Sequence, residues 1–277
     1  MRIDAHQHFW RPSRGDYGWL TPGAHPDICR DFGPDDLAPL LRRAGVDATV
    51  LVQAAPTAAE TGFLLAIAAA APFVAGVVGW VDLEAADAPA RIEALAEDAR
   101  LVGVRPMLQD LDDDAWILRP SVQPALDAIE AAGLGLDALV KPRHLPHVAA
   151  LLARRPALKL VIDHGAKPDI AGGGLAAWAA AIRSVAADTP AVCKLSGLVT
   201  EAAPKWCARD LKPYVEVLLE AFGPARLMWG SDWPVVNEAG GYLAWREAAE
   251  ALTAGLSAED RALVFGGAAA AFYGLAE

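Results

Sequence analysis

Cysteine is rare in this sequence. Only three are present among 277 residues, at Cys29, Cys193 and Cys207, so their number is odd and no two form a CxxC pair. This usage excludes a disulfide framework and is typical of a protein kept in a reducing compartment. We therefore expect a cytoplasmic protein.

Positive charge and long apolar runs are also scarce. Lys and Arg number 24 against 35 Asp and Glu, which gives a net charge of -11. Nucleic acids and anionic membranes both require a positive face, so neither is an expected partner. The alanine-rich stretch 58–71 contains Glu60 and ends before Pro72, so it is no membrane span. Met1 leads directly into a charged residue and a predicted strand, so we expect no signal peptide.

Short β-branched runs alternate with longer Ala, Leu, Glu and Arg stretches along almost the whole chain. The predicted strands are 2–6, 48–53, 74–81, 101–105, 135–141, 158–164, 191–196 and 226–231. The predicted helices are 35–44, 59–71, 88–99, 122–132, 146–154, 175–187, 208–222 and 241–252. Strict alternation indicates parallel strands joined by crossover helices.

An open doubly wound sheet and a closed (β/α)8 barrel both satisfy this alternation. The open sheet usually carries a glycine-rich phosphate loop after its first strand, and this chain has none there. Eight units in about 250 residues is typical of the barrel. We therefore predict one (β/α)8 TIM barrel domain over residues 1–277. Residues 9–33 form a long first loop of the lid or specificity kind, and the tail after Ser257 is predicted to be a helix on the outside of the barrel.

The first predicted strand ends in a His-x-His pair. Side chains alternate across a strand, so His6 and His8 point the same way while Gln7 points to the other face. Two imidazoles on one face suit a metal ion or a bound water better than a core.

Ionisable or polar residues stand at the ends of the other predicted strands as well. In a barrel these ends share one cavity, and they carry Gln53, Trp80, Arg105, Lys141, Asp163, His164, Lys194, Ser196, Asp232 and Trp233. Asp232 near two histidines suits a metal ligand or a general base. Three cations, Arg105, Lys141 and Lys194, would bind an anionic or polyhydroxylated substrate or stabilise an oxyanion. The alternative is that some of these cations only neutralise Asp163 or Asp232. Neither Ser196 nor Ser231 lies in a nucleophile elbow.

Five segments together carry a family resemblance: 3–10 (IDAHQHFW), 103–105 (GVR), 161–168 (VIDHGAKP), 194–197 (KLSG) and 228–234 (MWGSDWP). With them the chain resembles the amidohydrolase superfamily, in particular the amidohydrolase-related group that contains fuconolactonase-like and pyrone-dicarboxylate lactonase-like enzymes. The resemblance covers essentially the whole chain. It implies a lactonase that opens a sugar-derived lactone with a water activated by an aspartate.

The resemblance also implies roles for individual residues. Asp232 would be the base, and His6, His8 and His164 would orient the water or the carbonyl. Substrate would contact Gln53, Trp80, Arg105, Lys141, Lys194 and Trp233. Many members hold two metals with a histidine on strand 5, but here Lys141 stands there and His144 lies past Pro142. The expected cofactor is therefore either none or a single Zn²⁺ on His6, His8 and Asp232.

Two other functions stay open at this point. One is a zinc-dependent decarboxylase of the aminocarboxymuconate type, in which the same histidine pair would hold the metal. The other is a non-catalytic binding barrel. The expected partner is a small sugar lactone, and a homo-oligomer is left open.

Overall fold

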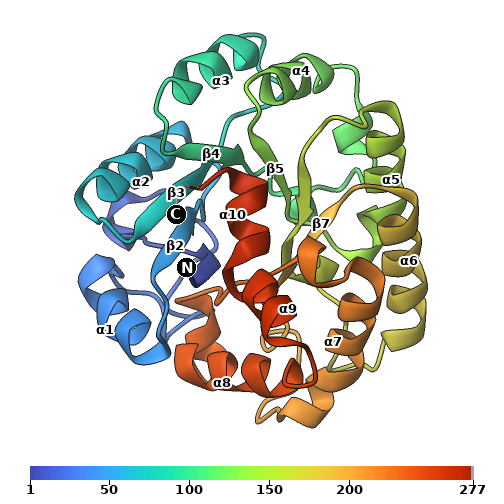
Figure 1. The fold of residues 1–277 in the computed structure, drawn as a ribbon. Helices are drawn as coiled ribbons and strands as arrows, with labels where there is room; N and C mark the ends of the chain where they lie inside the picture. The colour runs from blue at the N-terminus through green and yellow to red at the C-terminus, as the bar shows by residue number, and fades with distance from the viewer. Residues whose placement is uncertain (276–277) are drawn as a thin grey trace.

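Eight parallel strands form the centre of the computed structural model, which describes residues 1–275 (Figure 1). Each strand pairs with the next one in the sequence, in the order β1 to β8. The strands are β1 (Ile3–Gln7), β2 (Ala48–Val52), β3 (Val74–Gly79), β4 (Leu101–Val104), β5 (Gly135–Ala138), β6 (Leu160–Ile162), β7 (Val192–Leu195) and β8 (Leu227–Trp229).

Backbone hydrogen bonds between the end of β1 and the segment that follows β8 close the ring. The amide of Asp232 donates to the carbonyl of His6 at 2.8 Å, and the amide of His8 donates to the carbonyl of Trp233 at 2.7 Å. The predicted (β/α)8 barrel is confirmed. Most strands end one to three residues earlier than predicted, because the chain leaves the ladder where the polar residues begin.

A helix follows each strand, and together the helices surround the sheet in chain order (Figure 1). They are α1 (Pro34–Ala44), α2 (Ala58–Ala70), α3 (Ala88–Ala96), α4 (Gln123–Ala131), α5 (Leu145–Arg154), α6 (Leu175–Asp188), α7 (Ala208–Phe222) and α8 (Tyr242–Leu252). Local signals set their ends. The Thr57 hydroxyl caps α2 by accepting from the amide of Glu60, and Gly45 takes a left-handed conformation after α1.

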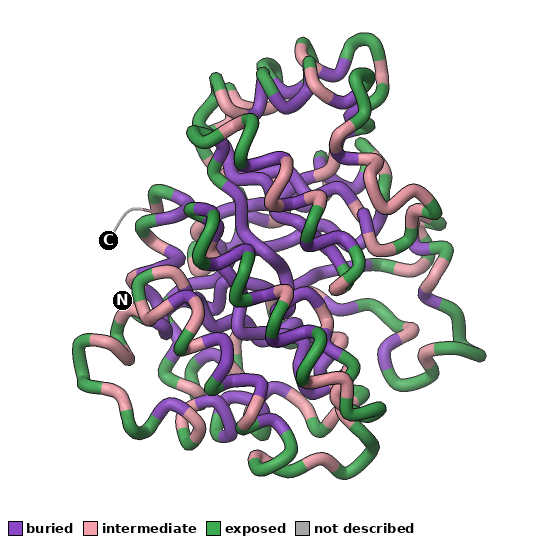
Figure 2. Tube along the Cα trace, turned by 90° about the vertical axis from the view of Figure 1, so that its right-hand side faces the viewer, coloured by how far each residue is buried: buried purple, intermediate pink, exposed green. Residues whose placement is uncertain are grey.

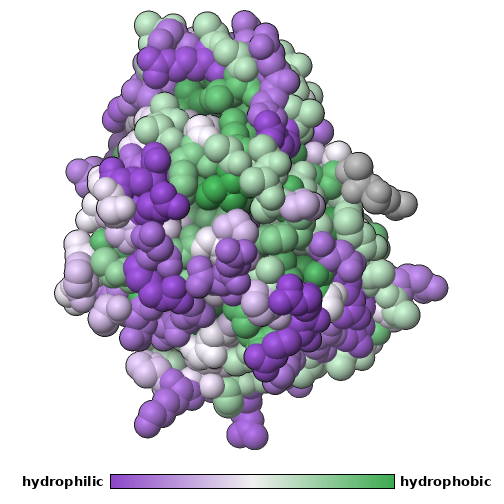
Figure 3. Space-filling view, turned by 90° about the vertical axis from the view of Figure 1, so that its left-hand side faces the viewer, coloured by the Kyte–Doolittle hydropathy of each residue, from purple (hydrophilic) through white to green (hydrophobic). Residues whose placement is uncertain are grey.

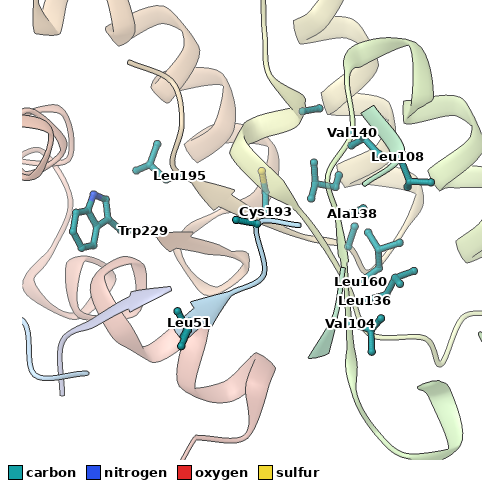
Figure 4. Close-up of a cluster of buried hydrophobic side chains, with 14 of the residues drawn as sticks. Leu51, Val104, Leu108, Leu136, Ala138, Val140, Leu160, Cys193, Leu195 and Trp229 are labelled. Carbon is teal, nitrogen blue, oxygen red and sulfur yellow. The ribbon is translucent and has the colours of Figure 1, made fainter. Parts of the chain in front are cut away.

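The apolar core has two layers, because successive side chains on a strand face opposite sides. On β2, Leu51 belongs to the outer layer beneath the helices, while Val50 and Val52 face the barrel interior. Figure 4 shows part of the outer layer, with Leu51, Leu136 and others projecting from their strands. Buried backbone is concentrated in these central strands, and exposed residues lie on the peripheral helices and loops (Figure 2).

The C-terminal segment differs from its prediction. After α9 (Ala258–Ala262) and one π-helical turn, α10 (Ala268–Tyr273) lies across the centre of the ring instead of on its outside (Figure 1). Phe272 and Tyr273 join the interior layer with Ile3 and Met228. Their bulky apolar side chains are buried there, so this helix closes the end of the barrel at which the strands begin.

The surface is mixed in character. On the side shown in Figure 3, hydrophilic residues surround smaller areas of hydrophobic ones. Within residues 1–275 there is no helix whose length and apolarity would allow it to cross a membrane.

Candidate active site

A cavity of about 350 Å³ lies where the strands end. It is lined by His8, Trp19, His25, Ala54, Arg105, Met107, Gln109, Asp110, Leu139, His164, Lys167, Asp232 and Val235. Four of the predicted site residues therefore line one hollow: His8, Arg105, His164 and Asp232. This is the end of the barrel at which TIM-barrel enzymes hold their active sites.

His6, His8 and Asp232 form a small triangle of donor atoms. The Nε2 atoms of His6 and His8 are 3.2 Å apart, and the Asp232 Oδ1 lies 3.2 Å from His8 Nε2 and 3.7 Å from His6 Nε2. The alternation of β1 brings the two imidazoles to the same side, as predicted. The Nδ1 of His8 donates to the carbonyl of Val52 at 2.7 Å, which turns its Nε2 toward the other two groups.

The backbone around Asp232 is fitted closely to β1. Asp232 has a φ of 57°, in the left-handed region that is uncommon for a residue with a side chain. A Cβ at the neighbouring Gly230 would lie 2.7 Å from the Cβ of His6, so only glycine lets β8 approach the histidine strand this closely. The same close contact between β1 and the segment after β8 that closes the barrel therefore also fixes the position of the Asp232 carboxylate.

His164 follows β6 and is also held tightly. Its Nδ1 lies 2.8 Å from the hydroxyl of Ser196, and its own φ is 55°. A Cβ at Gly197 would lie 2.6 Å from the imidazole, so glycine is required there as well. Burial lowers the pKa of His164 to about 4, which keeps the ring neutral at neutral pH.

The protonation states of the cluster follow from burial and from nearby charges. Burial and the Lys194 ammonium hold the pKa of His6 well below its usual value. Burial alone would raise the pKa of Asp232, but His164 and the hydrogen bond from His8 outweigh it and lower this pKa. The site therefore presents an ionised carboxylate close to the neutral rings of His6 and His164.

Arg105 is the cation at the cavity wall that is close to this cluster. Its Nη1 lies 3.3 Å from His6 Nε2 and 3.2 Å from Asp163, and its Nη2 donates to the carbonyl of Gln53. Gln53 in turn donates from its side-chain amide to the Arg105 carbonyl at 2.8 Å. Gln53 is buried and supports the guanidinium instead of lining the cavity.

Lys194 lies inside the barrel beneath the cluster and does not line the cavity. Its ammonium is 3.0 Å from Asp163, 2.5 Å from Asp137 and 3.2 Å from His6 Nδ1. Lys194 therefore makes the contacts expected of a cation that neutralises Asp163, which was the alternative raised from the sequence. Tyr273 also donates to Asp137, at 2.7 Å, so α10 reaches this buried network.

The remaining predicted contacts lie outside the cavity. Lys141 is exposed, and Trp233 is buried against Phe9 and Phe32. Trp80 lines a neighbouring cavity of about 570 Å³, which shares Trp19, Met107 and Asp110 with the first one.

Sequence reasoning missed the other nine residues of the cavity wall, and four of them carry side chains suited to binding a polar ligand: Trp19, His25, Gln109 and Lys167. Trp19 and His25 come from the long first loop, whose assignment as a lid or specificity element was the available signal. Lys167 stands three residues after His164 and lies 3.8 Å from Glu201.

The donor atoms fit one divalent metal ion. Tetrahedral Zn²⁺ with bonds of about 2.1 Å requires donor atoms roughly 3.4 Å apart, and the distances within the His6, His8 and Asp232 triangle bracket that value. A second trio, His6, Asp163 and His164, is close enough to consider. Asp163 is already paired with Arg105 and Lys194, so this trio is a poorer ligand set.

Comparison with known proteins agrees with this geometry. A family model described as amidohydrolase matches residues 3–275. The chain belongs to the amidohydrolase family. The structural resemblance extends to an amidohydrolase from Burkholderia multivorans solved with bound zinc, which is 40% identical, with a TM-score of 0.94 and 100% of both chains covered.

Two curated relatives of this amidohydrolase carry the same name. An L-fucono-1,5-lactonase from Burkholderia ambifaria is 51% identical, over 99% of this chain and 95% of the relative. An L-fucono-1,5-lactonase from Burkholderia multivorans is 40% identical, over 100% of this chain and 97% of the relative. The resemblance to lactonases inferred from the sequence motifs is confirmed.

Proposed function

We propose that this amidohydrolase hydrolyses a sugar-derived lactone. The observation that carries the proposal is the ionised Asp232 carboxylate beside three imidazoles, in a cavity that also holds the Arg105 guanidinium. Two relatives that align along nearly their full length are named L-fucono-1,5-lactonase. A sugar δ-lactone is therefore the substrate class that we propose for this chain.

Asp232 is the base in the proposed mechanism. Its carboxylate accepts a proton from a water molecule, and the water oxygen then attacks the lactone carbonyl carbon. The low pKa of Asp232 keeps it ionised, and the His8 contact at 3.2 Å orients it. Neutral His6 and His164 add hydrogen-bonding atoms around the water without competing for its proton.

Arg105 stabilises the charge that forms on the carbonyl oxygen. Its contacts with Asp163 and Gln53 fix the guanidinium before substrate arrives, so little reorganisation is needed as charge develops. The tetrahedral intermediate then breaks the bond between the carbonyl carbon and the ring oxygen, and the product is a hydroxy acid.

The rest of the wall suits a polyhydroxylated ring. Trp19 offers an indole beside the cavity, while Lys167 and Gln109 offer hydrogen-bond donors. A Zn²⁺ ion held by His6, His8 and Asp232 would supply Lewis-acid polarisation of the bound water or carbonyl.

The decarboxylase alternative has less support. It expects a strand 5 histidine at the metal, but His144 is buried, accepts a hydrogen bond from the amide of Lys141 at 3.0 Å and is absent from the cavity wall. A non-catalytic barrel would have no need for a carboxylate held in the left-handed region beside three imidazoles.

A panel of aldonolactones tests the proposal. Hydrolysis is followed by the fall in pH, with wild type, Asp232→Asn and the exposed control Asp31→Asn. We expect Asp232→Asn to lower kcat about 10²–10⁴-fold with an unchanged circular dichroism spectrum, because the base is lost and the shape is kept. Full activity in Asp232→Asn, or no activity of the wild type on any lactone, overturns the proposal.

A further inference from the structure

His25 stands apart from the three histidines of the cluster but lines the same cavity as Asp232. It comes from the first loop, between η1 (Pro12–Arg14) and α1, and about one third of its side chain is exposed, at 31%. Trp19 of the same loop packs edge-on against it, with ring centroids 5.2 Å apart. The imidazole is thus held at the cavity wall and is still accessible to a ligand.

Glu238 orients this imidazole. Its two carboxylate oxygens lie 2.9 and 3.1 Å from the Nδ1 of His25. Glu238 belongs to the short helix Val235–Ala239, which begins three residues after Asp232. Among residues 1–275 no hydrogen bond involves the Nε2 of His25, so this nitrogen is the one that can exchange a proton with a ligand. A carboxylate behind an imidazole is the arrangement by which enzymes fix the ring for proton transfer.

The proposed lactone reaction needs a second proton transfer, in addition to the one from water to Asp232: the leaving ring oxygen must receive a proton. When the tetrahedral intermediate collapses, the electron pair of the broken bond goes to the ring oxygen, which would otherwise leave as a strongly basic alkoxide. Arg105 does not give up its proton in proteins. His8 contacts Asp232 directly, so its proton belongs to the hydrogen-bonding network of the base.

We propose that His25, oriented by Glu238, is the general acid that protonates the leaving ring oxygen of the lactone. In its imidazolium form His25 gives the Nε2 proton to this oxygen as the bond from the carbonyl carbon breaks. The ring is left neutral, with its Nδ1 proton still bonded to Glu238. Asp232 has meanwhile taken one proton from water; it releases that proton to solvent, and His25 takes one back from solvent. The balance is one lactone and one water converted to one hydroxy acid.

This inference rests on the proposed lactonase function, and the experiment separates the two. Wild type, Asp232→Asn, His25→Asn, His25→Ala, Glu238→Gln and the control His147→Asn, which changes a half-buried histidine on α5, are compared on the lactone that the wild type hydrolyses best. Inactive wild type refutes the lactonase function itself. Active wild type with inactive Asp232→Asn keeps that function and leaves His25 to be judged alone.

We expect both His25 variants to lower kcat about 10²–10³-fold with KM changed less than about threefold, and Glu238→Gln to lower kcat about tenfold. Added imidazole should restore kcat of His25→Ala in a saturable way and should not restore Asp232→Asn. His25→Asn keeps an N–H that can bond Glu238 but cannot transfer a proton. Three outcomes overturn the proposal: unchanged kcat in His25→Ala, near-normal kcat in His25→Asn, or a loss in His25→Ala that imidazole does not repair.

Discussion

The ammonium of Lys194 lies 3.0 Å from the Asp163 carboxylate, and both side chains are fully buried. Burial alone would raise the pKa of Asp163, but Lys194, His6 and Arg105 outweigh it and hold this pKa well below its usual range. The same ammonium is 3.2 Å from the Nδ1 of His6. Lys194 therefore holds His6 in place from the barrel interior, and it does not line the cavity in which substrate would bind.

Removing this ammonium should destabilise the fold. In Lys194→Met two buried carboxylates, Asp137 and Asp163, lose a partner, and breaking a buried ion pair on one side costs about 3–5 kcal/mol. Urea denaturation should show this decrease in the free energy of unfolding. The exposed Lys212→Met, whose partner Glu216 is also exposed, serves as the control and should change stability by less than about 0.5 kcal/mol. A decrease in the free energy of unfolding of less than about 1 kcal/mol in Lys194→Met would contradict a stabilising role for these buried ion pairs.

Arg105 and Lys141 should respond differently to mutation, although both were predicted to contact substrate. A lysine at position 105 cannot contact Asp163, Gln53 and the cavity at once, because it lacks the planar fork of the guanidinium. We expect Arg105→Lys to lower kcat on a sugar lactone about 10²-fold. Lys141→Ala, at an exposed site outside the cavity wall, should keep kcat/KM within about twofold. Equal losses of kcat/KM in the two variants would mean that Lys141 does contact substrate.

The sequence was sufficient to predict the barrel and its reactive end. Alternating strands and helices bring the strand ends together whatever the loops do, so the structure gathers His6, His8, His164 and Asp232 as expected. Whether a side chain is buried in the barrel or reaches solvent depends on the exact residue at which its strand ends. Lys194 is still within β7 and points into the barrel, whereas Lys141 comes three residues after β5 has ended and reaches solvent.

Contacts made by long loops were not predictable in this way. His25 lines the cavity because its ring is bonded to Glu238, which is 213 residues further along the chain. The apolar and polar pattern of residues 9–33 has no regular period, so it gives no direction for any side chain. The C-terminal helix was misplaced for a related reason, since an apolar face packs equally well outside or across the end of a barrel.

Acid should destabilise the protein through His164. In the unfolded chain this histidine takes up a proton near its ordinary pKa of 6.5, whereas burial lowers the folded-state pKa to about 4. The unfolded state thus binds more protons as pH falls from 6.5 to 4, and stability is lost across that window by up to about 3 kcal/mol. His164→Asn lacks this group. Urea denaturation at several pH values between 7 and 4 should show a smaller loss in the variant than in wild type, and parallel curves would contradict the prediction.

We expect the protein to bind at most one divalent ion. His6, His8 and Asp232 have the spacing of one tetrahedral site, while the second trio depends on Asp163, which Arg105 and Lys194 already neutralise.

Equilibrium dialysis against Zn²⁺, followed by metal and protein analysis, checks this stoichiometry without reference to activity. We expect one ion per chain for wild type and for the control His147→Asn, and a large decrease for His8→Asn, which removes one of the three donors. Binding should also raise Tm in wild type, because an ion that binds only the folded state stabilises it by mass action, and the rise should be lost in His8→Asn. Two ions per chain would mean that Asp163 binds a metal in place of Arg105 and Lys194. That result would refute the prediction that the site holds at most one ion.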